Sequence, residues 1–160
     1  MKTSIIAMAL LVGTKLSAQS AGSPLKLEFH HATASVADMS RAIKWYEDKL
    51  GFKVILHKQL NADVDLAWLI IPGFRIDLIK YRGSTRPAPQ ENHLSTQGWA
   101  HIVFAVKDVD KAYAALKAKG VDLPEPVVTI DELHIRTSHF PDSEGNWLEI
   151  YQDVPASKKK

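Results

Sequence analysis

Two histidines and two carboxylates recur at matching positions in this 160-residue chain. One copy of a repeated pattern begins at His31 and ends in a strand-like run that carries Asp77, 46 residues later. The second copy begins at His101 and ends in a similar run that carries Glu149, 48 residues later. Imidazole nitrogens and carboxylate oxygens form a donor set that suits Zn, Ni, Co, Mn or Fe(II). Because chance does not readily put four such residues at equivalent repeat positions, we predict that the two histidines and one or both carboxylates hold a divalent metal ion.

The same repeat extends to the residues that begin and end helices. Each lead histidine is followed seven residues later by an aspartate, Asp38 or Asp108, which is placed as the N-cap of a helix. Gly51 and Gly120 follow apolar residues at helical spacing and are typical helix ends. The strand-like runs after them lie at about 53–59, 66–71, 75–81, 127–130, 134–140 and 147–152. Each copy is therefore predicted to fold as a strand, a helix and three strands.

The strand that carries each lead histidine has two unlike faces, because side chains alternate along a strand. In the first copy, over residues 25–36, His31 shares a polar face with Thr33 and Ser35, and small apolar residues occupy the other face. The apolar face suits a helix packed against the sheet, and the polar face suits a lined cavity. We predict an α+β fold in which two tandem βαβββ modules form a curved mixed sheet around a metal-site cavity. Both lead histidines are expected to point inward.

The composition excludes several kinds of site. The chain has no cysteine, which removes disulfides, thiolate metal ligands and a cysteine nucleophile together. Outside the N-terminal segment that contains Lys2 and Lys15, 18 basic residues balance 18 acidic residues. A balanced chain gives no electrostatic case for binding nucleic acid. The sequence contains no phosphate-cradling glycine loop and no serine-triad motif.

Residues 1–20 have the pattern of a bacterial secretory signal peptide, with a short basic start, an apolar core and a small-residue cleavage zone. The apolar run is too short to span a bilayer, so we expect a secreted or periplasmic protein with no membrane anchor. Residues 25–155 are expected to form a single domain. Its predicted parts are a first module at about 27–81, a linker at 82–97 and a second module at about 98–152.

Several motifs agree in order and spacing with one known superfamily. Each module opens with H-x-x-x-x-V-x-D, the helices end in LGF and KGV, and PDSEGNWLEI lies near the end. From about residue 27 to residue 151, the chain resembles the vicinal oxygen chelate superfamily, the glyoxalase, bleomycin-resistance and extradiol dioxygenase group. In metal-using members, the lead histidines and a residue on each final strand bind the metal. The resemblance thus implies the ligands His31, Asp77, His101 and Glu149, but Asp77 stands where glutamate or glutamine is common. Being shorter, Asp77 could bind loosely, bind through water or act as a base.

The resemblance implies an exported metal-dependent enzyme. A glyoxalase-like lyase or an isomerase or epimerase would act on a small oxygenated substrate through a metal-stabilised enolate, with Asp77 or Glu149 moving the proton. One alternative is an Fe(II) extradiol-type dioxygenase that uses His31, His101 and Glu149. Another is a metal-free protein that binds a small molecule, as bleomycin-resistance members do. Homodimers are common in the family, so a homodimer is possible here.

A few further residues have weaker signals. His134 and His139 are predicted on opposite faces of one strand, so one of them could border the cavity as a proton carrier. Arg75 shares the face of Asp77 and is expected to pair with it, although it could also hold an anionic substrate. Trp99 lies two residues before His101 and is expected in the core.

Overall fold

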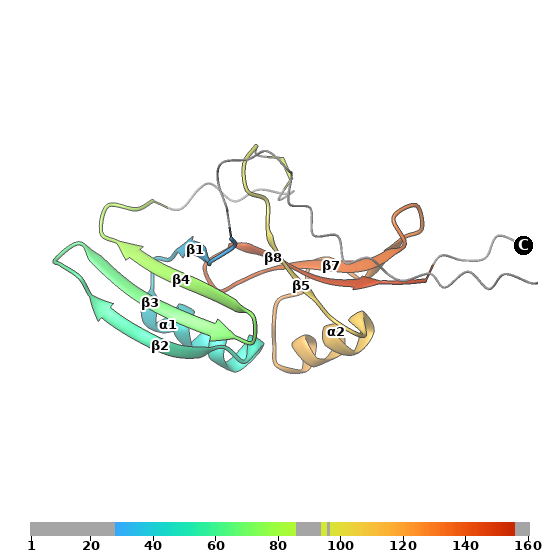
Figure 1. Cartoon of the computed structure of the whole chain (residues 1–160), viewed down its shortest axis with the longest axis horizontal. Coiled ribbons are helices and arrows are strands. Elements are labelled where there is room, and N and C mark those ends of the chain that lie inside the picture. The colour runs from blue at the N-terminus through green and yellow to red at the C-terminus, as the bar shows by residue number, and fades with distance from the viewer. Residues whose placement is uncertain (1–27, 86–93, 96, 156–160) are drawn as a thin grey trace, which may run out of the picture.

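The computed structural model describes residues 28–85, 94, 95 and 97–155, and these form the same order of elements twice (Figure 1). The first module contains β1 (Ala32–Ser35), α1 (Met39–Trp45), a π-helical turn η1 (Tyr46–Leu50), β2 (Lys53–Gln59), β3 (Val64–Ile71) and β4 (Phe74–Tyr81). The second contains β5 (Ile102–Ala105), α2 (Val109–Ala118), β6 (Val128–Ile130), β7 (Ile135–Pro141) and β8 (Trp147–Asp153). The predicted α+β fold of two βαβββ modules is confirmed.

Each module forms its own four-stranded mixed sheet, with strand orders β1-β4-β3-β2 and β5-β8-β7-β6. The first strand of each module runs parallel to the last strand, and the other pairs are antiparallel. Figure 1 shows the two sheets side by side along the long axis, with α1 and α2 on the same side of them. This order places the strand that follows each lead histidine directly beside the strand that carries the matching carboxylate.

Each helix begins at the predicted aspartate. The Asp38 carboxylate accepts the Arg41 backbone N–H, and the Asp108 carboxylate accepts the Lys111 backbone N–H, at 3.0 Å in both cases. The bond from Arg41 lowers the pKa of Asp38, since it favours the ionised carboxylate. Gly51 follows the first helix with a φ of 75°, in the left-handed region that glycine tolerates best. The predicted helix boundaries are therefore confirmed at both ends of the first helix.

The two faces of the lead strands are as predicted. In β1, Ala34 is buried and Thr33 and Ser35 are exposed. In β5, Phe104 packs against both hydrophobic cores, whereas Val103 is 48% exposed. The apolar faces thus contact the helices, and the other faces are open to solvent or to a ligand.

The two modules are joined by an aromatic contact and by one buried turn. The Phe104 ring lies edge-on to Phe52 and Phe74, with centroids 6.1 and 5.6 Å away. In the turn between β7 and β8, Asp142 accepts a hydrogen bond of 3.0 Å from the fully buried Tyr46 hydroxyl. Burial, with the Asp142 carboxylate nearby, raises the pKa of Tyr46 well above its usual value. The second module is thus anchored to the first helix.

Glu144 adds further bonds between the same turn and the first helix. Its carboxylate accepts the Ala37 backbone N–H at 2.8 Å and the Arg41 guanidinium at 2.9 and 2.6 Å. The side chain of Glu144 is almost fully buried, whereas that of Arg41 is half exposed. Two guanidinium nitrogens donate to one carboxylate oxygen, Oε1, while Oε2 accepts from Ala37, so the charge-assisted contact helps to fix where the turn meets the helix.

The predicted signal peptide, residues 1–20, lies outside the described residues, as does much of the 82–97 linker. Among the described helices, none has the length and apolar character needed to cross a bilayer.

Candidate metal centre

The second module brings two histidines and a carboxylate to one place. Glu149 in β8 lies beside Val103 of β5 and directly opposite His139 of β7. His101 precedes Val103 by two residues, so it is on the same side of the sheet. The His101 Nε2 atom lies 2.8 Å from Glu149 Oε2, and the His139 Nε2 atom lies 3.6 Å from that oxygen. The carboxylate therefore faces both imidazoles.

Other side chains orient this group. The Glu125 carboxylate lies 3.0 Å from His139 Nδ1, and the other ring nitrogen, Nε2, faces Glu149. The Thr137 hydroxyl donates to Glu149 Oε1. Metal-binding histidines and carboxylates typically have such partners, which contact the ring nitrogen or the oxygen that does not face the metal.

In the first module, the lead histidine and the matching carboxylate both lie next to the guanidinium of an arginine. His31 Nε2 lies 3.5 Å from Asp77 Oδ2, and Arg75 Nε lies 2.8 Å from Asp77 Oδ1. The Arg75 guanidinium also lies 3.1 Å from His31 Nδ1 and over the Trp68 ring, 4.6 Å from its centroid. The predicted pairing of Arg75 with Asp77 is confirmed, and His31 lies close to both of these residues.

The four predicted ligands thus lie as two pairs, one in each module. Within the described part of the chain, one group of three ligand residues has its donor atoms within 4.8 Å of one another, and it consists of His101, His139 and Glu149. His31 and Asp77 are not in that group. A site shared by all four predicted residues stays a prediction.

His139 is the residue that the sequence interpretation undervalues. The sequence predicts at most a proton carrier there, and the side chain lies directly across the β7–β8 hairpin from Glu149. A signal for this is present, because His139 and Glu149 are equally far from Glu144 in the turn-forming PDSEGN segment. An antiparallel hairpin pairs residues that are equidistant from its centre.

The interpretation of Trp99 as a core residue is wrong, because its side chain is fully exposed, with a relative exposure of 103%. Phe29 stands at the equivalent place, two residues before His31, and is 75% exposed. Both strands that would have carried these aromatics begin later, at Ala32 and Ile102. Each module therefore presents an exposed aromatic ring next to its lead histidine in sequence.

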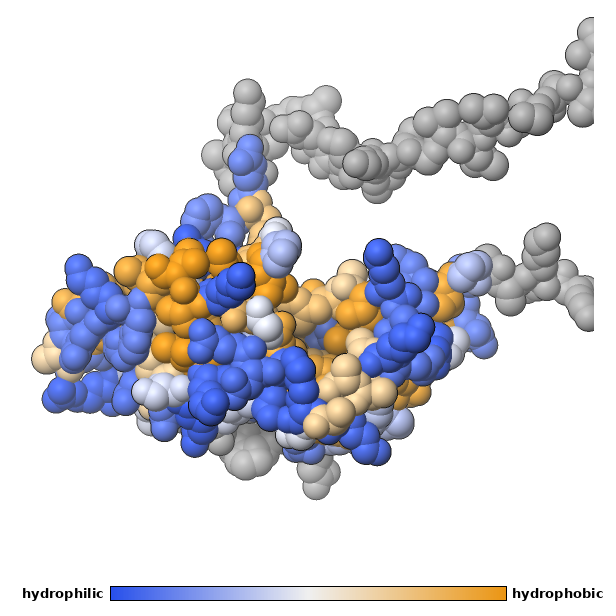
Figure 2. All heavy atoms as spheres, turned by 90° about the horizontal axis from the view of Figure 1, so that it is seen from below, coloured by the Kyte–Doolittle hydropathy of each residue, from blue (hydrophilic) through white to orange (hydrophobic). Residues whose placement is uncertain are grey.

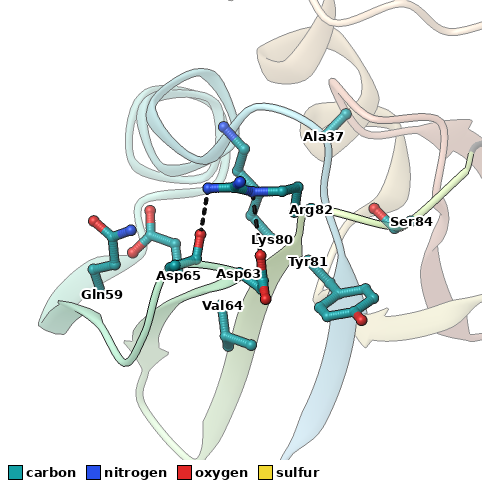
Figure 3. Close-up of a pocket in the computed structure, with 10 residues that line it drawn as sticks. Ala37, Gln59, Asp63, Val64, Asp65, Lys80, Tyr81, Arg82 and Ser84 are labelled. Atoms are coloured by element: carbon teal, nitrogen blue, oxygen red, sulfur yellow. Dashed lines mark hydrogen bonds and ion pairs between the residues drawn. The ribbon is translucent and has the colours of Figure 1, made fainter.

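Two cavities lie away from these pairs. One, of about 480 Å³, lies at the ends of β3 and β4 in the first module (Figure 3). There Arg82 bonds Asp63 and the Ala62 carbonyl at 3.2 and 2.8 Å, and Lys80 lies opposite Asp65. Its charged lining residues are two aspartates, one lysine and one arginine.

The other cavity, of about 320 Å³, lies between the modules and is lined mainly by apolar residues from both. Leu50 and Phe52 come from the first module, and Leu116 and Ile150 from the second. Figure 2 shows hydrophobic residues gathered over the first module and towards the middle of the molecule. Both cavities are lined by residues other than the four predicted ligands.

Comparison with known proteins gives a family-model match. The family described as "Glyoxalase/Bleomycin resistance protein/Dioxygenase superfamily" matches residues 28–150. Uncharacterized protein YraH of Bacillus subtilis is 29% identical over 121 residues, which cover 73% of this chain and 91% of YraH. Among solved structures, a glyoxalase family protein from Enterococcus faecalis aligns with a TM-score of 0.66 and 22% identity, over 78% of this chain and 96% of that one.

A structure of a mutant of FosX, a genomically encoded fosfomycin resistance protein of Listeria monocytogenes, is also similar. It aligns with a TM-score of 0.58 and 18% identity, over 79% of this chain and 90% of FosX. That structure contains Mn(II) and 1S,2S-dihydroxypropylphosphonic acid. At these identities, the two solved structures establish a common fold.

Proposed function

Because the chain belongs to the glyoxalase, bleomycin resistance protein and dioxygenase superfamily, we propose that it is a divalent-metal-dependent lyase or isomerase acting on a small oxygenated molecule. The observation that carries this proposal is the pairing of His101 with Glu149, whose facing atoms are 2.8 Å apart at the two positions predicted as second-module ligands. The Mn(II) in the FosX structure supports the choice of a divalent ion.

The chemistry of the donors fits such an ion. Glu149 lies on β8 and His101 directly precedes β5, and both side chains are largely buried, at 9% and 19% exposed. Nitrogen and oxygen donors suit Zn, Ni, Co, Mn and Fe(II), and the chain has no cysteine, the ligand that softer metals prefer. We therefore propose His101 and Glu149 as ligands. His31 and Asp77, the ligands predicted from the sequence in the first module, stay a prediction.

A bound divalent ion supplies Lewis-acid polarisation of neighbouring substrate oxygens. The chain's own part in the proposed reaction is to position the substrate and to move a proton. Asp77 is one candidate base, as the sequence predicts, and Arg75 orients its carboxylate through a 2.8 Å ion pair. Glu149 is the other candidate for this step, oriented by the Thr137 hydroxyl.

A second candidate function is favoured by the group of two histidines and one carboxylate. His101, His139 and Glu149 have the composition of the facial triad of non-haem Fe(II) oxygenases. The test is oxygen uptake with catechols by protein loaded with Fe(II) under anaerobic conditions. Uptake that requires the catechol would favour the dioxygenase over the lyase or isomerase.

The proposed metal dependence is tested by elemental analysis of the purified protein together with the His101→Gln variant. We expect about one divalent ion per chain in the parent protein and a loss of most of it in the variant. His57→Gln is the matched control, because His57 is an exposed histidine on β2 that pairs with Asp65. A parent protein that binds a small molecule tightly but holds no metal would instead indicate a metal-free binding protein.

We also propose export and self-association for this enzyme. Export rests on the signal-peptide pattern of residues 1–20, and N-terminal sequencing of protein recovered from a bacterial periplasm checks it.

A homodimer is supported by the exposed aromatic residues Phe29 and Trp99, since large exposed apolar side chains often mark an interface. Sedimentation velocity of the parent protein and of Trp99→Ser tests this, and equal monomer masses for both would contradict it.

A further inference from the structure

His139 stands where a third ligand would be needed in the second module. Its Nε2 atom lies 3.6 Å from Glu149 Oε2, and His101 Nε2 lies 2.8 Å from the same oxygen. Donor atoms around a zinc ion with bonds of ~2.0–2.1 Å are roughly 3.3 Å apart in a tetrahedral site. The two separations bracket that value, and the three donor atoms all lie within 4.8 Å. Small side-chain rotations would thus give a common ion all three donors.

The surroundings of His139 are also those of a ligand. Glu125 lies 3.0 Å from Nδ1, which leaves Nε2 as the nitrogen that faces the group. The carboxylate, histidine and ion then follow one another as in the carboxylate–histidine–metal arrangement of many protein sites. Thr137 gives Glu149 the same support from the other side. Each ligand on the β7–β8 hairpin therefore has a partner that fixes its orientation.

The first module has a different electrostatic character. Between His31 and Asp77 lies the Arg75 guanidinium, 3.1 Å from the histidine Nδ1 and 2.8 Å from the aspartate Oδ1. Arginine stays protonated in proteins, so a positive charge already neutralises Asp77. A divalent cation at this pair would face that charge at short range. His30 Nδ1 is also within 2.7 Å of His31 Nδ1, which gives that nitrogen a second neighbour.

We propose that the metal ion is held within the second module alone, by His101, His139 and Glu149, and that the His31–Asp77–Arg75 group does not bind it. The proposal rests on the proposed metal dependence and changes which residues carry it. The remaining coordination positions are then left for water or for the substrate, as in catalytic sites with three protein ligands.

The experiment measures Zn(II) and Co(II) binding to the full chain by equilibrium dialysis with elemental analysis, and the Co(II) absorption spectrum. His139→Gln is compared with His31→Gln, Asp77→Asn and the control His57→Gln. We expect the parent to bind one ion per chain. His139→Gln should bind the ion at least tenfold more weakly and show an altered Co(II) spectrum. The variants His31→Gln, Asp77→Asn and His57→Gln should bind it with affinities within threefold of the parent. Glu125→Gln should weaken binding by about 10- to 100-fold.

Circular dichroism of the apo variants shows whether each one folds, so that a loss of metal is assigned to the ligand. Should a folded His139→Gln bind as the parent does, or should His31→Gln or Asp77→Asn lose the ion, the single-module site is wrong. In those cases the proposed metal dependence still stands, provided that the parent holds one ion. A folded parent that binds neither Zn(II) nor Co(II) overturns both proposals.

A site within one module also predicts how affinity depends on protein concentration. Because each chain would contain all three ligands, the dissociation constant should not change when the chain is diluted below any dimerisation threshold. An ion shared between the modules of two chains would be released on dilution, which would contradict the proposal.

Discussion

Removing the Tyr46 hydroxyl tests how the two modules are held together. Tyr46 belongs to the first module and is fully buried, and its hydroxyl donates to Asp142 of the second module at 3.0 Å. The substitution Tyr46→Phe keeps the ring, and with it the edge-on contacts to Trp45 and Phe52. It therefore deletes one hydrogen bond between the modules and changes little else.

The expected loss follows from what Asp142 keeps. A hydrogen bond to a charged group contributes ~1.5–3 kcal/mol to stability. In the variant, Asp142 still accepts the backbone N–H groups of Glu144 and Asn146 and the Asn146 side-chain amide, at 2.8, 2.8 and 2.9 Å. The carboxylate is not left without donors, so we expect the lower part of that range, ~1.5–2 kcal/mol. For a chain of this size, this corresponds to a fall in Tm of about 3–8 °C.

The assay is urea unfolding followed by circular dichroism at pH 7, with Tyr113→Phe as the control. Tyr113 is a half-buried tyrosine on α2 that packs against the second core, and its hydroxyl makes no hydrogen bond within the described residues. We expect the control to lose less than about 0.5 kcal/mol, as surface-like changes usually do.

A pH series adds a second readout for Tyr46. Burial raises the pKa of Tyr46 in the folded protein, so its favourable contribution is fully present below the pKa of an unfolded tyrosine, about 10. Above that pH the unfolded chain ionises first, and the stability advantage of the parent over Tyr46→Phe should shrink. A variant as stable as the parent at pH 7, or a difference that grows between pH 9 and 11, would refute the reasoning.

Three further outcomes are expected. Gly51→Ala should lower the unfolding free energy by ~1–2 kcal/mol in urea titrations, because Gly51 has a φ of 75°, and Gly51→Asn should lower it less. An Ala variant as stable as the parent would contradict this. Asp38→Ala should lower the Tm at pH 7. The difference in Tm between the parent and the variant should disappear as the pH falls below about 3.8 and through the lowered pKa of Asp38 in the folded protein, which calorimetry can check. Removing the metal with a chelator should lower the Tm of metal-loaded parent, and an unchanged Tm in differential scanning fluorimetry would count against the proposed metal dependence.

The repeated elements could be predicted from the sequence because their signals are local. Asp38 and Asp108 mark helix starts, and Gly51 marks a helix end, whatever the rest of the chain does. The lead strands are shorter than predicted, since β4 begins only at Phe74 and β8 at Trp147. A strand that extends back towards residue 25 or residue 99 would run past the start of its parallel partner and find no backbone groups to pair with.

The sequence predicts the candidate metal centre only in part. His101 and Glu149 stand at the matching positions that the repeat and the resemblance single out, and their pairing follows from the strand order of the module. The role of His139 depends on the register of a hairpin, and a shift of one residue would turn its side chain to the other face. The position of one module relative to the other depends on contacts between distant residues, such as Tyr46 with Asp142, which no local pattern reports.

The outer strands of the two sheets bear on how the protein avoids aggregation. β1, β5 and β6 are only three or four residues long, and short edges offer few free backbone groups to another chain. The seven-residue β2 is the long edge, and it carries Lys53, His57 and Lys58 as exposed side chains. Positive charge along such an edge discourages strand addition. We therefore expect that copies of this chain do not associate by extending a sheet, and that replacing both lysines with threonine would promote fibril formation.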